Sequence, residues 1–185
     1  MKDGLFTKPV FVCSGRRSGV FHPFLLKKNI TEITVEELRE MGVVGLLLDV
    51  DNTLTAHDSQ ELSPAVADWL ETVMRAGMRP LIVSNGKKKR VQPFAKRLGL
   101  PFTASAAKPL PFGFWRAARS LGLKRRRCVV IGDQIFTDVL GGKCAGIRVI
   151  QLLPLAPETD KPFIHFKRKW ERRIMRHWKE TEGML

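Results

Sequence analysis

The sequence has few cysteines and no long hydrophobic run. Its three cysteines stand at unrelated spacings, which excludes a disulfide framework and a cysteine-based zinc site and predicts a reducing, cytoplasmic location. No uncharged apolar stretch approaches the length of about 20 residues that a transmembrane helix needs, so membrane spanning is excluded. An arginine pair at 16–17 precedes a short apolar run, but Pro23 interrupts that run, and a twin-arginine export signal is not expected.

Acidic residues are absent from residues 87–127, where the chain carries 13 lysines and arginines. Residues 41–86 carry six acidic and two basic side chains, so almost all of the net charge of +14 lies in one segment. Such a segment is either a set of solvated helix faces or a surface for a polyanion or an anionic membrane. Charge alone favours solvated faces.

Short apolar runs alternate with helical patterns through most of the chain. The apolar runs predict five buried strands, at 43–48, 80–83, 102–104, 128–131 and 147–153. Between them, apolar residues at helical spacing predict helices after Ser63-Pro64, over 91–98, over 111–121 and from about 136 to 145. This alternation predicts an α/β domain, a doubly wound, Rossmann-like parallel sheet of five strands covered on both faces.

Two segments flank this predicted core, which comprises residues 43–155. Residues 1–42 are expected to form an N-terminal arm and a short helix, because Thr34 and Glu37 have the spacing of a capping box. Residues 156–185 are expected to form a linker rich in proline and then a basic amphipathic helix.

The C-terminal helix carries both aromatic and basic residues. Its large apolar residues are predicted to share one face: Phe163, Phe166, Trp170, Ile174 and Trp178. That face either packs on the sheet or, over residues 163–179, lies in the plane of an anionic membrane. The density of basic residues on the rest of the helix leaves both alternatives open.

Polar side chains follow four of the predicted strands, at the edge where doubly wound sheets bind ligands. They are Asp49, Asp51 and Thr53 after the first strand, Ser84 and Asn85 after the second, Lys108 after the third, and Asp133 and Asp138 after the fourth. Each group alone is more often structural than catalytic. Their order, each at a strand end, is a combination that chance would rarely produce.

This combination resembles the four motifs of the haloacid dehalogenase superfamily of phosphohydrolases over about residues 43–153. Two motifs, Asp49-Val-Asp-Asn-Thr-Leu54 and Gly132-Asp-Gln-Ile-Phe-Thr-Asp138, are similar to those of the capless subfamily IIIA. This subfamily contains the bacterial YqeG proteins and the mitochondrial phosphatidylglycerophosphate phosphatases. The resemblance implies a haloacid dehalogenase-like fold and a Mg²⁺-dependent phosphatase.

Phosphoryl transfer needs a nucleophile, a proton donor and positive charge around the phosphate. The resemblance assigns catalysis to Asp49 as nucleophile, to Asp51 as acid and base, and to Lys108 as the cation. It places Mg²⁺ on Asp49, Asp51 (through its carbonyl) and Asp133. Substrate binding falls to Thr53, Ser84 and Asn85, and Asp138 is expected to hold Lys108 or a metal-bound water. His57, which follows the first loop, is a further candidate for contact with the leaving group.

The short spacings between the motifs leave no room for a cap domain. Thirty residues separate Thr53 from Ser84 and 22 separate Asn85 from Lys108, enough for one helix and one strand in each case. An open site is typical of enzymes that act on large or lipid substrates. We therefore expect a phosphorylated substrate, with phosphatidylglycerophosphate or a similar anionic phospholipid first, at the inner face of the membrane.

Other functions remain as alternatives to the lipid hypothesis. One keeps the chemistry and assigns a nucleic-acid end or a soluble phosphate ester. Another is a non-enzymatic adaptor that binds RNA or membrane. The intact set of Asp49, Asp51, Lys108 and Asp133 argues against the adaptor, because a degenerate scaffold would be expected to lose at least one of these residues.

Overall fold

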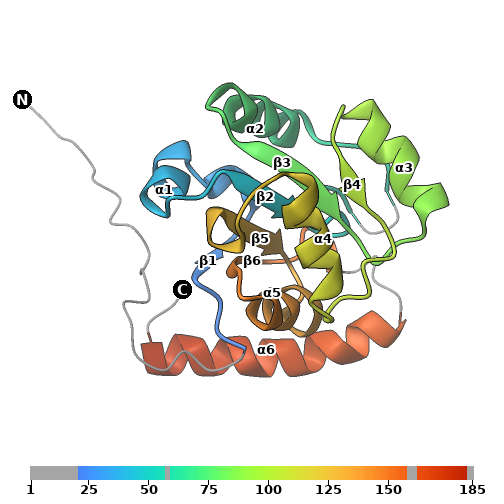
Figure 1. The fold of residues 1–185 in the computed structure, drawn as a ribbon. Helices are drawn as coiled ribbons and strands as arrows, with labels where there is room; N and C mark the ends of the chain where they lie inside the picture. The colour runs from blue at the N-terminus through green and yellow to red at the C-terminus, as the bar shows by residue number, and fades with distance from the viewer. Residues whose placement is uncertain (1–20, 57–58, 158–161, 183–185) are drawn as a thin grey trace, which may run out of the picture.

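The fold is described here from a computed structural model, which defines residues 21–182 apart from 57–58 and 158–161. Its described part contains one parallel sheet of six strands in the order β1-β6-β5-β2-β3-β4 (Figure 1). The strands are β1 (Leu25–Lys27), β2 (Gly45–Leu48), β3 (Arg79–Val83), β4 (Phe102–Thr103), β5 (Cys128–Gly132) and β6 (Arg148–Leu152). The chain leaves β2 in one direction across the sheet and later returns to its other side, so β2 and β5 flank the topological switch point.

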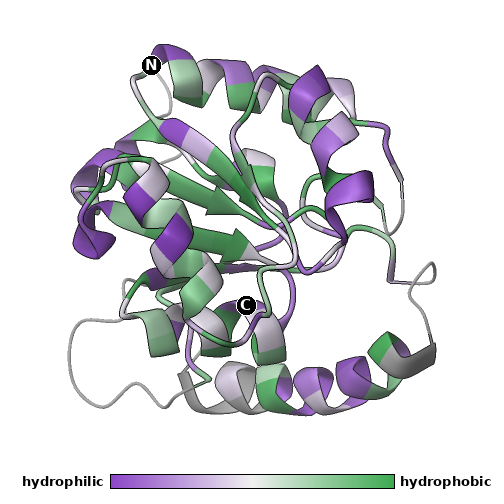
Figure 2. Ribbon diagram, turned by 45° about the vertical axis from the view of Figure 1, so that its right-hand side comes forward, coloured by the Kyte–Doolittle hydropathy of each residue, from purple (hydrophilic) through white to green (hydrophobic). Residues whose placement is uncertain are grey.

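Helices connect the strands and cover the sheet. They are α1 (Val35–Glu40), α2 (Pro64–Arg75), α3 (Lys88–Arg97), α4 (Phe112–Ser120), α5 (Leu140–Ala145) and α6 (Pro162–Glu182). Short 3₁₀ turns, η1 (Ile30–Glu32) and η2 (Arg125–Arg127), and one π-helical turn, η3 (Ile135–Val139), complete the described elements. Figure 2 shows predominantly hydrophobic strands between helices that carry both hydrophobic and hydrophilic bands.

Two hydrophobic cores lie on the two faces of the sheet. On β2, Leu46 and Leu48 belong to the core beneath α1, α2 and α3, and Leu47 belongs to the core beneath α4 and α5. This division follows from the alternation of side chains along a strand. The run of apolar residues on β2 is therefore buried on both faces, as a central parallel strand requires.

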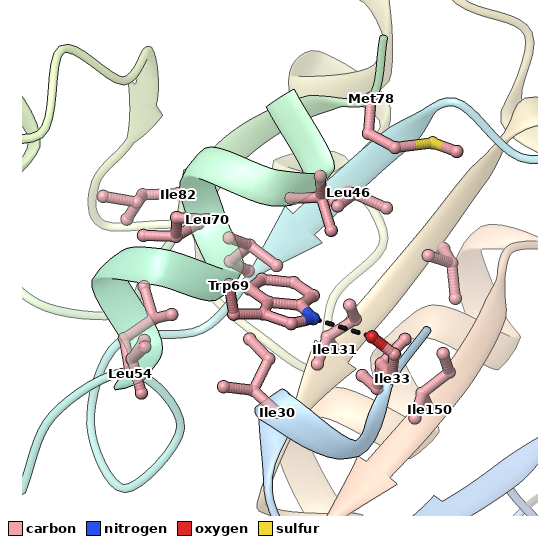
Figure 3. Close-up of a cluster of buried hydrophobic side chains, with 14 of the residues drawn as sticks. Ile30, Ile33, Leu46, Leu54, Trp69, Leu70, Met78, Ile82, Ile131 and Ile150 are labelled. Atoms are coloured by element: carbon pink, nitrogen blue, oxygen red, sulfur yellow. Dashed lines mark hydrogen bonds between the residues drawn. The ribbon is translucent and has the colours of Figure 1, made fainter. Parts of the chain in front are cut away.

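The first core illustrates how helix α2 is fixed. Ser63 caps the helix by accepting a hydrogen bond from the Val66 amide, and Pro64 occupies the first turn. Trp69 then points into the core, where its indole N–H donates to the Ile33 carbonyl at 2.7 Å (Figure 3). This buried bond ties α2 to the segment before α1.

The predicted α/β architecture is confirmed, and the described sheet holds one strand more than the five predicted. The additional strand is β1, which pairs in parallel with β6 from Leu25 to Lys27. The N-terminal region from residue 25 therefore contributes to the sheet. Between the motifs, the described residues form α2 with β3 and α3 with β4, and no cap domain is present among them.

The faces of α6 differ from the prediction. Phe166 and Trp170 are exposed, whereas Arg168 and Glu171 are buried together with Trp178. The physical reason is that Arg168 forms an ion pair with Asp133, so a charged residue turns inward. The side chain of Phe163 lies outside the described residues.

Candidate active site

The predicted site residues meet at the carboxyl edge of the sheet, around a cleft of about 250 Å³. The loops after β2, β3 and β5 and the loop that follows β4 all reach this edge. The cleft is lined by Asp49, Asp51, Ser84, Asn85, Gly86, Arg90, Lys108, Gln134, Thr137, Ile164 and Lys167. Because the strands are parallel, side chains far apart in the sequence converge here.

A buried lysine joins two carboxylates at the base of the cleft. The ammonium group of Lys108 donates to Asp49 Oδ1 at 2.5 Å and to Asp138 Oδ1 at 2.7 Å. All three side chains are at least nine-tenths buried. The predicted contact between Asp138 and Lys108 is thus present, and the same lysine also holds Asp49.

Burial controls the charge states of this group. It raises the pKa of Asp49 to about 7, although the Lys108 charge opposes the shift. Burial alone would lower the pKa of Lys108, but the carboxylates of Asp138 and Asp49 outweigh it and raise that pKa above its ordinary value. Lys108 therefore stays a cation next to Asp49.

The loop after β5 carries Asp138 and brings one more carboxylate, Asp133, to the same place. Asp138 Oδ2 accepts a hydrogen bond from the Gln134 amide at 3.2 Å, which closes the loop on η3. Gly132 is required by this packing, since a Cβ there would lie 2.4 Å from Asp138 Cγ. The Gly-Asp pair thus lets η3 approach the end of the strand closely enough to place Asp138 beside Asp133.

Asp49, Asp133 and Asp138 form a set that could hold a metal ion. One carboxylate oxygen from each lies within 4.8 Å of the others. Asp133 Oδ1 is buried and has no hydrogen-bond partner, which is unusual for a carboxylate. Three buried oxygen ligands suit Mg²⁺, so the residues fit the predicted cofactor. The Asp51 carboxylate, by contrast, belongs to a separate ion pair.

The charge balance of the interior also fits a divalent cation. Among the described residues, the buried ionisable side chains of this edge are four carboxylates and two cations: Asp49, Asp133, Asp138, Glu171, Lys108 and Arg168. With all six ionised, they would leave an excess of two negative charges, and uncompensated buried charge is costly. Burial accordingly raises the pKa of Asp133 well above its ordinary value, against the opposing charge of Arg168. One Mg²⁺ ion would cancel the excess.

The loop after β3 supplies Ser84 and Asn85. The Ser84 hydroxyl lies in the cleft and accepts from the Gly86 amide at 3.0 Å. Asn85 bonds the main chain of Lys108 twice, donating to its carbonyl at 3.0 Å and accepting from its amide at 2.7 Å. Asn85 therefore fixes the position of the loop that carries Lys108.

Three predicted site residues do not line the cleft: Asp133 and Asp138, which are buried, and Thr53. Thr53 is fully buried and does not line the cleft. His57 lies outside the described residues.

Arg90 is a cleft residue that the sequence did not single out. It lies on α3 and forms two hydrogen bonds with the Asp51 carboxylate, one of them Nη1 to Oδ2 at 2.9 Å. In the sequence it is one of four consecutive basic residues, and nothing distinguishes it from Lys87, Lys88 or Lys89. Only the direction of the helix shows which of the four faces Asp51.

Helix α6 also reaches the cleft, a role that the sequence did not predict. Ile164 and Lys167 line the cleft, and Arg168 contacts Asp133 beneath it. Figure 1 shows α6 as a long helix that runs along one side of the molecule next to α5. No helix among the described residues is both long and apolar enough to cross a membrane.

The basic segment 87–127 divides between the two ends of the sheet. Arg90 and Lys108 lie at the cleft. The other end of the segment, from Arg119 to Arg126, lines a separate hollow of about 1010 Å³ near the start of β5. Only part of the excess charge therefore acts on the candidate site.

A parallel α/β sheet with a buried aspartate cluster and a lysine at its carboxyl edge defines a class of hydrolases. The sequence profile of haloacid dehalogenase-like hydrolases matches residues 13–146. The chain belongs to this family, and it is a phosphatase of the haloacid dehalogenase type.

Two relatives show which phosphatases this chain is similar to. Over 155 residues the chain is 43% identical to the protein named "Probable phosphatase YqeG" of Bacillus subtilis (strain 168), covering 84% of this chain and 90% of that protein. It is 25% identical over 169 residues to "Phosphatidylglycerophosphate phosphatase 1, chloroplastic" of Chlamydomonas reinhardtii; this covers 86% of the chain but only 61% of that relative.

A solved structure supports the fold. The structure of a HAD superfamily (subfamily III A) hydrolase from Legionella pneumophila matches 69% of this chain and 77% of its own, with a TM-score of 0.51 and 22% identity. At that identity the likeness concerns the fold alone.

Proposed function

We propose that this protein is a Mg²⁺-dependent phosphomonoesterase that acts through an aspartyl-phosphate on Asp49, with an anionic phospholipid headgroup such as phosphatidylglycerophosphate as substrate. The single observation that carries the lipid substrate is the position of α6, which lines the cleft with Lys167 and exposes Phe166 and Trp170 to solvent. The aspartate cluster with Lys108 carries the chemistry.

In the first step a carboxylate oxygen of Asp49 attacks phosphorus, and the bond from phosphorus to the ester oxygen breaks. Ser84 donates its hydroxyl hydrogen to a phosphate oxygen, and Lys108 neutralises charge on Asp49 and on the transferred group. Asp49 and Asp133, with the Asp51 carbonyl or Asp138 as a further ligand, would hold Mg²⁺, which would supply Lewis-acid charge at the phosphate.

Asp51 handles the protons. It lies at the cleft two residues after Asp49, where Arg90 holds its carboxylate. Asp51 in its protonated form gives its proton to the leaving alkoxide, and the resulting carboxylate then takes a proton from the water that attacks the aspartyl-phosphate. That second attack breaks the bond between phosphorus and the Asp49 oxygen, releases phosphate and restores the carboxylate.

Exposed apolar side chains support a lipid surface at this edge. Of the exposed large hydrophobic residues in the described chain, two lie on α6 and three more follow the carboxyl end of a strand: Leu110, Phe112 and Leu155. Basic residues of α6, among them Lys169 and Arg173, are exposed beside Phe166 and Trp170. Aromatic and cationic side chains together are typical of helices that bind anionic membranes. The relative named as a phosphatidylglycerophosphate phosphatase supports the same substrate.

The substrate class is tested by phosphate release from a panel of substrates. With Mg²⁺ present, kcat/KM for phosphatidylglycerophosphate in mixed micelles is expected to exceed that for soluble sugar phosphates and for a 5′-phosphorylated oligonucleotide by at least about tenfold, an advantage worth about 1.4 kcal/mol. A higher kcat/KM for the oligonucleotide or for a soluble ester would contradict the lipid assignment and leave the reaction class intact.

The membrane contact is tested with the double variant Phe166→Ser/Trp170→Ser. Burying one large apolar side chain contributes roughly 1.5–3 kcal/mol, so partitioning onto anionic vesicles should fall at least about tenfold. Sedimentation with vesicles of phosphatidylglycerol measures it. Met74→Ser is the matched control, because Met74 is an exposed apolar residue at the opposite edge of the sheet. An equal loss of vesicle binding in both variants, or no loss in the double variant, would show that α6 does not contact the membrane.

A further inference from the structure

Arg168 differs from the other basic residues of α6. Arg172, Arg173 and Arg176 are exposed, whereas Arg168 is only 2% exposed. A buried arginine is costly unless it is paired and hydrogen-bonded. Its contacts must therefore explain why it turns inward.

The guanidinium of Arg168 contacts Asp133 at two points. Its Nη2 donates to the carboxylate oxygen Oδ2, and its Nη1 donates to the carbonyl oxygen of the same residue at 3.1 Å. The carbonyl also accepts from Gln151 Nε2 at 2.5 Å. Side chain and main chain of Asp133 are thus held together, which restricts the rotation of the carboxylate.

These contacts leave one specific oxygen available to a ligand. Oδ2 is engaged by Arg168, while Oδ1 is buried and has no hydrogen-bond partner. Asp133 also belongs to the cluster with Asp49 and Asp138. Holding one oxygen from behind fixes the direction of the other, as partners of metal ligands commonly do.

Glu171 links this arrangement to the neighbouring loop. Its Oε2 accepts from Arg168 Nη1 at 3.3 Å, and its Oε1 accepts from the Phe136 amide at 3.3 Å. Phe136 belongs to η3, the turn that carries Asp138. Helix α6 therefore braces both Asp133 and the turn that places Asp138, and the buried Trp178 anchors the same face of the helix.

We propose that Arg168 is a positioning residue for the metal site: it orients Asp133 so that Oδ1 faces the cation, and Glu171 holds Arg168 in place. The inference deepens the proposed function and rests on its metal site, but it is independent of the lipid substrate. A positioning role for Arg168 makes α6 part of the active centre. Metal affinity, and not only turnover, should therefore depend on a residue of the C-terminal helix.

Isothermal titration with Mg²⁺, without substrate, tests the proposal on the full chain. Loss of such a partner commonly weakens metal binding by 10- to 100-fold, and Arg168→Ala is expected to raise the dissociation constant by about that factor. Arg168→Lys, which keeps the charge and one hydrogen bond, should fall between Arg168→Ala and wild type. Arg172→Ala, an exposed arginine of the same helix, is the control and should match wild type.

Other results would overturn the proposal. An unchanged dissociation constant in Arg168→Ala would make the ion pair merely structural, and tighter binding would make Arg168 a competitor of the metal. Circular dichroism shows whether Arg168→Ala folds. If it does not fold, the Mg²⁺ affinities of Arg168→Lys and Glu171→Gln are measured in its place. Wild-type affinity in both variants would refute the proposal. Failure of wild type itself to bind Mg²⁺ would instead refute the metal site of the proposed function, and the inference with it.

Discussion

Asp49→Asn is expected to reduce Mg²⁺-dependent phosphate release by at least about 10⁴-fold. Asparagine keeps the shape of the side chain but cannot attack phosphorus, and loss of a covalent nucleophile removes the main catalytic route. Initial rates on the preferred substrate, at saturating Mg²⁺, measure the effect. Residual activity should come only from phosphate binding by Ser84 and Lys108.

The control for this substitution is Asp68→Asn, because Asp68 is an exposed carboxylate on α2 with no part in the site. Its rate should equal that of wild type. Wild-type activity in Asp49→Asn would refute the assignment of the nucleophile. Circular dichroism of both variants separates a loss of chemistry from a loss of fold.

Lys108→Met is expected to lower the free energy of unfolding by roughly 3–5 kcal/mol and to abolish activity. Breaking a buried ion pair from one side leaves an uncompensated charge, and here two buried carboxylates, Asp49 and Asp138, lose their shared cation. Urea denaturation in the presence of EDTA measures the stability without compensation by a bound metal.

Lys89→Met serves as the comparison for that measurement. Lys89 is an exposed residue of α3, and exposed substitutions of this kind usually change stability by less than about 0.5 kcal/mol. Equal stability of the two variants would show that Lys108 is not the cation that holds the cluster together. A large loss in Lys108→Met alone is the expected result.

The part of the site that lies on strand ends could be predicted from the sequence. Buried parallel strands are short apolar runs, and the polar residues that follow them must meet at one edge of the sheet. Asp49, Ser84, Lys108 and Asp133 were found in this way, and the structure brings them to one edge. For these residues, the local sequence pattern is enough to place the side chain at the correct edge of the sheet.

The contribution of α6 could not be predicted, because it depends on a tertiary contact. On hydropathy alone Arg168 and Glu171 belong on the solvent side and Phe166 and Trp170 belong inside. Arg168 pairs with Asp133 and with Glu171, and these contacts place the two charged residues of α6 on the inward face and leave Phe166 and Trp170 exposed. The spacing of residues within α6 does not reveal a contact with Asp133 on another element.

Arg90 and β1 show two other reasons for incomplete prediction. Arg90 is one of four adjacent basic residues, and only the orientation of α3 selects it as the partner of Asp51. β1 is three residues long and is recognised as a strand through its pairing with β6, because Leu25 and Leu26 alone carry no periodic signal.

The site of phosphorylation during turnover tests the central claim most directly. The reaction is stopped with acid, the protein is digested, and the peptide that contains Asp49 is examined by mass spectrometry. The account predicts one added phosphoryl group on Asp49 in wild type with Mg²⁺ and substrate, and none in Asp49→Asn. A phosphoryl group on another residue, or turnover with water as the direct nucleophile and no phosphorylated peptide, would contradict it.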